Sequence, residues 1–135
     1  MIEQKQFTEK VVKKLLERFP QFADHYVQKL GDIVDIEYKS NTGELELYIT
    51  TQDIEITIGF EDTKKLSDWH VHITTYDETD LDNDIENAID LIDYILSDKW
   101  PISHSNLRGY SLHNKDQIIE PLAEEIIVKK WWSEL

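Results

Sequence analysis

The strongest constraint on the fold is a change of period at residue 33, after which apolar and polar residues alternate in four separate runs up to residue 74. Strict alternation puts every second side chain on the same side of the backbone, so each run predicts a β-strand with one buried and one open face. The turn-forming residues Asn41-Thr42-Gly43 join the first two runs as a hairpin. Four strands in this order predict an antiparallel meander.

The two faces of this predicted sheet differ in chemistry. One face is aliphatic and is expected to pack on helices. The residues expected on the other face are Asp35, Glu37, Glu44, Glu46, Tyr48, Glu55, Thr57, His70 and His72. This second face would therefore present mainly carboxylates and imidazoles.

Residues 3–30 have helical periodicity instead. Apolar residues between Phe7 and Phe19 recur at three- and four-residue steps, with charged residues on the other side, as in a surface helix with one buried stripe. Pro20 ends or kinks this helix, and proline is well tolerated as the first residue of a new one. The apolar residues that follow, stopped by Gly31, predict a second short helix with a glycine C-cap.

Two further helices are expected in the second half of the chain. An acidic helix with a strong apolar stripe should follow the fourth strand, capped by Thr79 or Asp80. It should end just before Pro101, because the residue before a proline avoids helical backbone. The stretch from Glu120 to Trp132 predicts a C-terminal helix with a proline near its start and lysines near its end.

Between these helices, residues 102–114 predict either a short late hairpin, turned at Arg108-Gly109, or an irregular loop. The full set of elements predicts an α+β fold. A length of 135 residues fits one domain, residues 1–135, with a core of its own.

Acidic residues dominate the charge of the chain, and the formal net charge is −14. Between Lys65 and Lys99 there are ten carboxylates and no Lys or Arg. Such a field disfavours nucleic acid and anionic membranes as direct partners, because phosphate binding depends on Lys and Arg. Two interpretations stay open: a solvated helix face, or a surface that recognises a basic protein.

Several classes of protein are disfavoured by what the sequence lacks. There is no cysteine, which excludes disulfides and thiolate metal sites and is compatible with the cytoplasm. The N-terminal residues lack the apolar core of a signal peptide, and no run reaches the roughly 18 apolar residues of a membrane span. No nucleophile elbow and no phosphate-binding loop is present, so no enzymatic activity and no cofactor is expected.

His70 and His72 are the residues that support an alternative function for the protein. They lie on one face of a predicted strand, roughly 7 Å apart, where Glu55 or Glu46 on a neighbouring strand could share a metal ion with them. A small metal-binding or enzymatic domain is therefore the alternative function. The preferred interpretation is that both histidines decorate the open face and hydrogen-bond to carboxylates, with no metal.

A family resemblance rests on two strand segments and the helix after them. Residues 53–60 read DIEITIGF, residues 68–73 read DWHVHI, and the helix contains AIDLI at residues 88–92. This arrangement resembles small, acidic, cysteine-free α+β immunity proteins of bacterial polymorphic toxin and contact-dependent growth inhibition systems. The resemblance implies a stoichiometric inhibitor without activity of its own, which binds a toxin domain such as a nuclease with a basic cleft.

The expected partner-binding residues are those of the acidic run and of the adjoining open sheet face. They are Asp77, Glu78, Asp80, Asp82 and Asp84, with Glu55, His70 and His72. Reversing the charges at Asp82 and Asp84 is expected to slow association with the partner. The protein is expected to be a monomer or a homodimer, and a third interpretation is a scaffold that dimerises through its open sheet face or through Trp131 and Trp132.

Overall fold

A computed structural model of the protein describes residues 2–40, 43, 45–62, 68–100, 102–105, 109–112 and 126–129. Its main layer is an antiparallel five-stranded sheet in the order β1-β2-β3-β4-β5. The strands are β1 (Tyr26–Lys29), β2 (Ile33–Lys39), β3 (Leu45–Thr50), β4 (Glu55–Asp62) and β5 (Asp68–Thr74). The α+β class is confirmed, and the predicted meander is confirmed as β2 to β5.

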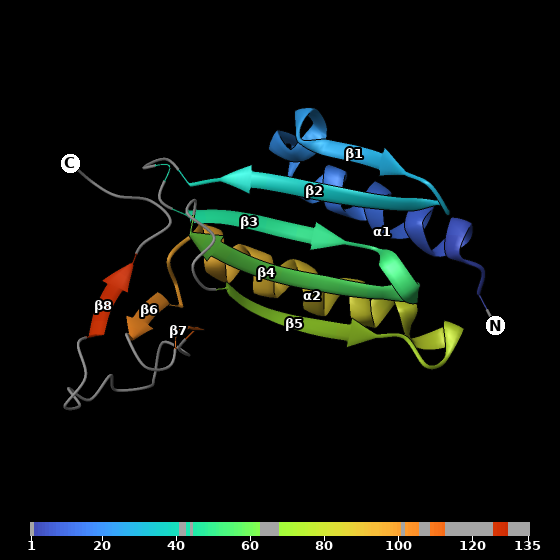
Figure 1. The fold of residues 1–135 in the computed structure, drawn as a ribbon. Helices are drawn as coiled ribbons and strands as arrows, with labels where there is room; N and C mark the ends of the chain where they lie inside the picture. Colours follow the sequence, from blue (N-terminus) through green and yellow to red (C-terminus); the bar gives the residue numbers. More distant parts are fainter. Residues whose placement is uncertain are drawn as a thin grey trace.

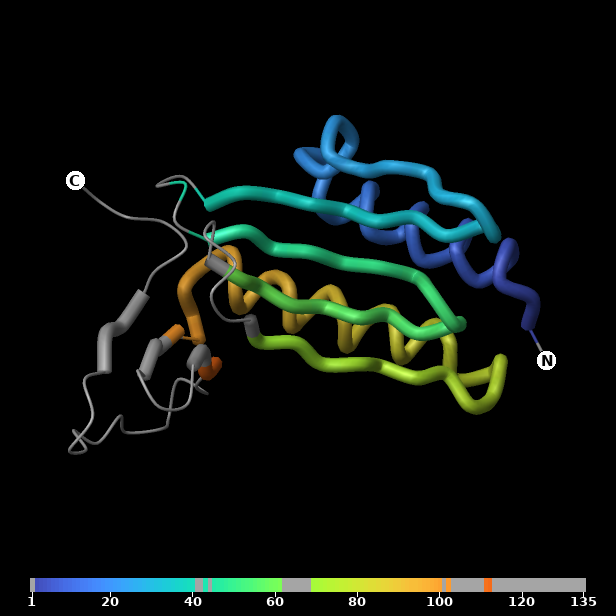
Figure 2. Tube along the Cα trace, in the orientation of Figure 1, coloured from blue at the N-terminus to red at the C-terminus, as the bar shows by residue number. Residues whose placement is uncertain are grey.

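Two helices, α1 (Gln4–Arg18) and α2 (Leu81–Leu96), lie side by side on one face of this sheet (Figure 1, Figure 2). The core lies between them and the sheet, where buried apolar residues of β2, β3 and β4 meet the apolar stripes of both helices. The opposite face, which carries the alternate residues of each strand, is covered by no described helix and is called the open face below. In the described part of the chain, neither helix combines the length and the apolar composition needed to cross a membrane.

The N-terminal third departs from the prediction after α1. The prediction of a second helix is wrong. Pro20–Asp24 form a 3₁₀ turn, η1, and Tyr26–Lys29 form the edge strand β1. Gly31 has a φ of +82° and turns the β1–β2 hairpin, where a helix cap was expected. Pairing of this segment with β2 overrides its local helical periodicity, because strand formation depends strongly on tertiary context.

A buried polar network ties the first turns of α1 to one end of the sheet. The hydroxyl oxygens of Thr51 and Thr8 lie 2.9 Å apart, and the Val34 N–H donates to Thr51 Oγ1 at 3.0 Å. The Gln4 amide donates to the Thr51 carbonyl at 2.6 Å and accepts from the Ile54 N–H at 3.1 Å. Ile54 has a φ of +55°, which is rare for a β-branched residue. Gln4 therefore holds a strained connection between β3 and β4.

α2 is the acidic helix expected after the fourth predicted strand. It follows a short 3₁₀ turn, η3 (Glu78–Asp80), and its buried stripe matches the predicted one. Asp80 is at the N-cap position, as one of the two expected candidates, but its side chain makes no capping hydrogen bond. Thr79 lies in η3, where its N–H donates to Asp77. The helix ends at Leu96, before Pro101, as expected.

The C-terminal part forms a second sheet of three strands in the order β7-β6-β8. The strands are β6 (Ile102–Ser105), β7 (Gly109–Leu112) and β8 (Ile126–Lys129). The late hairpin is confirmed by the antiparallel pair β6–β7. The predicted C-terminal helix is wrong over β8, where three consecutive β-branched residues favour a strand. The other residues of that predicted helix, Trp131 and Trp132 included, lie outside the described residues.

Candidate functional site

The open face carries acidic residues on three adjacent strands of the main sheet. The register places them in rows across the strands. One row contains Lys39, Glu46 and Glu61; the next contains Glu37, Tyr48, Gly59 and His70; a third contains Asp35, Thr50, Thr57 and His72. With Glu55 at the start of β4, the strands β2, β3 and β4 place five carboxylates on this face, beside two lysines, Lys29 and Lys39.

Two of these carboxylates oppose each other directly, since Glu46 on β3 is the cross-strand neighbour of Glu61 on β4. Facing side chains in an antiparallel pair have Cβ atoms about 4.5–5.5 Å apart, and like charges in that position are destabilising. Lys39 stands on the other side of Glu46 in the register. Even so, no ion pair joins Glu46 or Glu37 to a cation in the described part of the chain. The open face thus concentrates negative charge.

The carboxylates surround a shallow groove of about 280 Å³ on the open face. Its acidic lining residues are Asp35, Glu37, Glu46 and Glu61. Tyr48, Thr50 and Gln52 add an aromatic ring, a hydroxyl and an amide. Lys29 forms an ion pair with Asp35, which raises the pKa of Lys29 above its usual value of 10.5, through their hydrogen bond first and their charge attraction second. The charge of Asp35 is thereby neutralised locally.

Tyr48 forms part of the floor of this groove and lies across β4 at Gly59. A Cβ atom added to Gly59 would lie 2.5 Å from Tyr48 Cζ and 2.6 Å from Tyr48 Oη. The phenol end of the ring therefore occupies the space that a side chain at residue 59 would fill. Gly59 is buried beneath it, whereas Tyr48 itself is half-buried. The absence of a side chain at Gly59 lets the ring lie low over the sheet.

The two histidines singled out by the sequence lie together on β5. Their ring centroids are 5.1 Å apart. His72 Nδ1 lies 3.0 Å from Glu55 Oε2 and 2.8 Å from Thr57 Oγ1. The structure therefore brings Glu55, His70 and His72 together, and His72 makes the expected contact with a neighbouring carboxylate, Glu55. The described residues include no group of three or more His, Cys, Asp or Glu side chains that could hold a metal ion.

The acidic run around the start of α2 lies apart from this face. Asp82 is exposed on α2, which covers the opposite side of the sheet. Two of the five run members have local bonds: Asp84 accepts from the Thr75 hydroxyl at 2.9 Å, and Asp77 accepts from the N–H and the hydroxyl of Thr79. The eight predicted partner-binding residues therefore do not lie on a single face.

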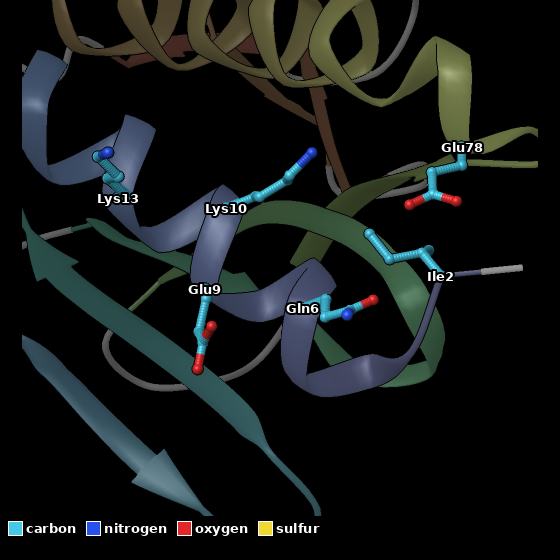
Figure 3. Close-up of a pocket in the computed structure, with 6 residues that line it drawn as sticks. All are labelled: Ile2, Gln6, Glu9, Lys10, Lys13 and Glu78. Carbon is cyan, nitrogen blue, oxygen red and sulfur yellow. The ribbon is translucent and has the colours of Figure 1, made fainter.

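Glu78 lines a second groove, on the helix-covered side. This groove has a volume of about 390 Å³. Its other lining residues are Ile2, Gln6, Glu9, Lys10 and Lys13. Figure 3 shows Glu78 on one side of the space and Lys10 extending from α1 on the other. Because both cations and anions line it, this groove lacks the single sign of charge found among the residues that line the groove on the open face.

The substitution Asp77→Ala is expected to lower the melting temperature at neutral pH. The hydrogen bond from the Thr79 N–H, followed by that from its hydroxyl, lowers the pKa of the Asp77 carboxyl below its usual value of 3.8. A carboxyl with a lowered folded pKa stabilises the fold above its unfolded pKa and loses this effect as the pH falls through the folded value. The difference in melting temperature between wild type and variant, followed by circular dichroism, should therefore narrow below pH 3.8, where the carboxyl loses its charge.

The matched control is Asp77→Asn, which keeps an acceptor oxygen for the Thr79 N–H but carries no charge. Its melting temperature should lie between those of the wild type and the alanine variant. A difference for Asp77→Ala that stays constant well below pH 3.8 would contradict the capping role.

The groove includes residues that the sequence placed on the open face but that were not among the predicted partner-binding residues. Asp35, Glu37, Glu46 and Tyr48 are all members of the predicted polar rows. The signal that marks Gly59 is its position inside a run of alternating residues, since a glycine within a strand often marks a close approach.

Comparison with known proteins gives no match: no protein-family model fits the chain, and no curated protein and no solved structure was found to be similar to it.

Proposed function

We propose that this protein is an immunity protein, which binds and neutralises a cognate bacterial toxin domain through an acidic surface. The toxin domain would be basic, as a nuclease is where it holds phosphate. The observation that carries the proposal is the groove on the open face lined by four carboxylates, of which Glu37 and Glu46 form no ion pair in the described part of the chain. A cationic partner would supply the counter-charge that these two carboxylates lack in the free protein, which would stabilise the complex.

The overall charge supports the same function through the rate of association. A formal net charge of −14 creates a field that attracts a basic partner at long range and speeds encounter. Fast association suits an inhibitor that must capture its toxin before the toxin acts. The exposed acids of α2 contribute to this field even though they lie on the opposite side of the sheet from the groove.

The test uses the C-terminal domain of the large secreted protein expected to be encoded immediately upstream. Expression of that domain alone should arrest growth of a bacterial host, and co-expression of this protein should restore growth. The purified pair should form a complex whose association rate falls roughly tenfold or more as the ionic strength rises from about 0.01 M to about 0.15 M.

An upstream frame without a toxic domain, or a toxic domain that this protein neither binds nor neutralises, would contradict the proposal. The charge-reversal pair Asp82→Lys and Glu86→Lys, both exposed on α2, should slow association while leaving dissociation nearly unchanged. Asp84 is left out of this pair because its bond to Thr75 would be lost as well.

A further inference from the structure

We infer that the groove around Tyr48 is an arginine-binding subsite, in which one arginine of the partner lays its guanidinium on the Tyr48 ring and pairs with Glu37 or Glu46. The inference rests on the proposed function for the identity of the partner. The preference for arginine follows from the groove itself and can be tested without the toxin.

The aromatic part of the subsite is the Tyr48 ring. Because its phenol end lies over Gly59, the ring lies low against β4, and Tyr48 lines the groove. A guanidinium is planar, is weakly hydrated and stacks on aromatic faces. Such a cation over a tyrosine ring is attracted within about 6 Å of the ring centre.

The anionic part of the subsite consists of Glu37 and Glu46, which flank Tyr48. Glu37 is the cross-strand neighbour of Tyr48 on β2, and Glu46 is the preceding residue on the same face of β3, roughly 7 Å along the strand. A carboxylate can accept two parallel N–H bonds from one guanidinium. A lysine ammonium offers neither the flat surface nor the two parallel donors, so the groove should favour arginine.

The other charged surfaces among the described residues do not combine, in one groove, an aromatic ring with flanking carboxylates. The groove at Glu78 is lined by Lys10 and Lys13, which repel a cation. The acids at the start of α2 lie on an exposed helix surface, where they act through their field. The structure therefore favours a division of roles: α2 attracts the partner, and the open face of the sheet holds it.

The first test uses two capped peptides of equal charge, acetyl-Gly-Arg-Gly-amide and acetyl-Gly-Lys-Gly-amide. Each is titrated into the protein labelled with ¹⁵N and followed by NMR. The arginine peptide should bind more tightly and should shift amide signals of β2, β3 and β4 around Tyr48. Equal affinities, or shifts confined to the helix-covered side, would overturn the inference.

The second test measures variants of the subsite, with their folding checked by circular dichroism. Tyr48→Leu should abolish the preference for the arginine peptide, and Glu37→Gln should reduce it, because Glu46 remains as a second carboxylate. Tyr48→Phe, which keeps the ring, should retain the preference. In complex with the toxin domain, Tyr48→Leu should weaken affinity by roughly thirtyfold, mainly through faster dissociation. Asp82→Asn, which removes the same charge as Glu37→Gln from α2, is the matched control and should leave the peptide preference unchanged.

The two tests separate this inference from the proposed function. If the wild type neutralises the toxin and the subsite variants do so equally well, the toxin docks elsewhere and the inference fails while the function stands. If the wild type does not bind the toxin domain, the proposed function fails, and the peptide titrations still decide whether the groove prefers arginine.

Discussion

The substitution Phe22→Ala is expected to lower the free energy of unfolding by about 3–5 kcal/mol, the usual cost of emptying a buried phenylalanine site. The Phe22 side chain has no solvent exposure. Its ring centroid lies 5.3 Å from that of Phe19 and 5.3 Å from that of Tyr38 on β2. It therefore anchors the 3₁₀ turn η1 to the sheet, and its loss should also loosen β1. Urea denaturation followed by circular dichroism measures the change.

The control for this prediction is Leu30→Ala, in the turn after β1. Leu30 is 97% exposed, so its truncation should change the free energy of unfolding by no more than about 0.5 kcal/mol. If Phe22→Ala cost as little as Leu30→Ala, the placement of Phe22 in the core would be contradicted.

The same segment shows where sequence reasoning meets its limit. The spacing of Phe22, Tyr26, Val27 and Leu30 predicts a buried helical stripe, yet only Phe22 is buried. The exposed fractions of Tyr26 and Val27 are 43% and 59%, because both lie on the edge strand β1. Periodicity reports which side chains could share a face of a helix. It does not report whether the backbone can pair with a neighbouring strand, and here this segment pairs with β2.

The strands from β2 to β5 could be predicted because burial and periodicity agree along them. One face of the sheet must be apolar to pack on α1 and α2, so a one-residue slip would expose a whole row of core residues. The sequence therefore specifies both the strands and their two faces. For example, Ile49 and Ile58 are paired in the register and buried, while Glu46 stands among the polar residues on the open face.

The candidate site could be predicted only in part, because its geometry depends on register and on layers. The sequence places Glu37, Glu46 and Tyr48 on the open face, as observed. The opposition of Glu46 and Glu61 and the position of the Tyr48 ring require knowledge of which residues pair across strands. The acidic run was expected to share one docking surface with this face, yet two of its five members, Asp82 and Asp84, lie on α2, on the other side of the sheet.

The substitution Gly59→Ala is expected to destabilise the protein by about 1–3 kcal/mol and to displace Tyr48 from the groove. The new Cβ would meet the Trp69 carbonyl oxygen of β5 at 2.5 Å, as well as the Tyr48 ring. The ring can swing outward, but the carbonyl moves only if the β4–β5 pairing shifts. Urea denaturation measures the free energy of unfolding. The NMR titration reports whether the Tyr48 ring has moved, because its displacement should weaken binding of the arginine peptide.

A double-mutant cycle with Tyr48→Ala separates the two contacts, because residues in direct contact give non-additive effects. In the Tyr48→Ala background, the cost of Gly59→Ala should shrink to the part due to the Trp69 carbonyl, which remains in place. A cost of Gly59→Ala that is the same in both backgrounds would show that the ring does not occupy the space over Gly59. The aromatic floor of the arginine subsite would then lose its physical basis, while the acidic groove would remain as a docking surface for a basic partner.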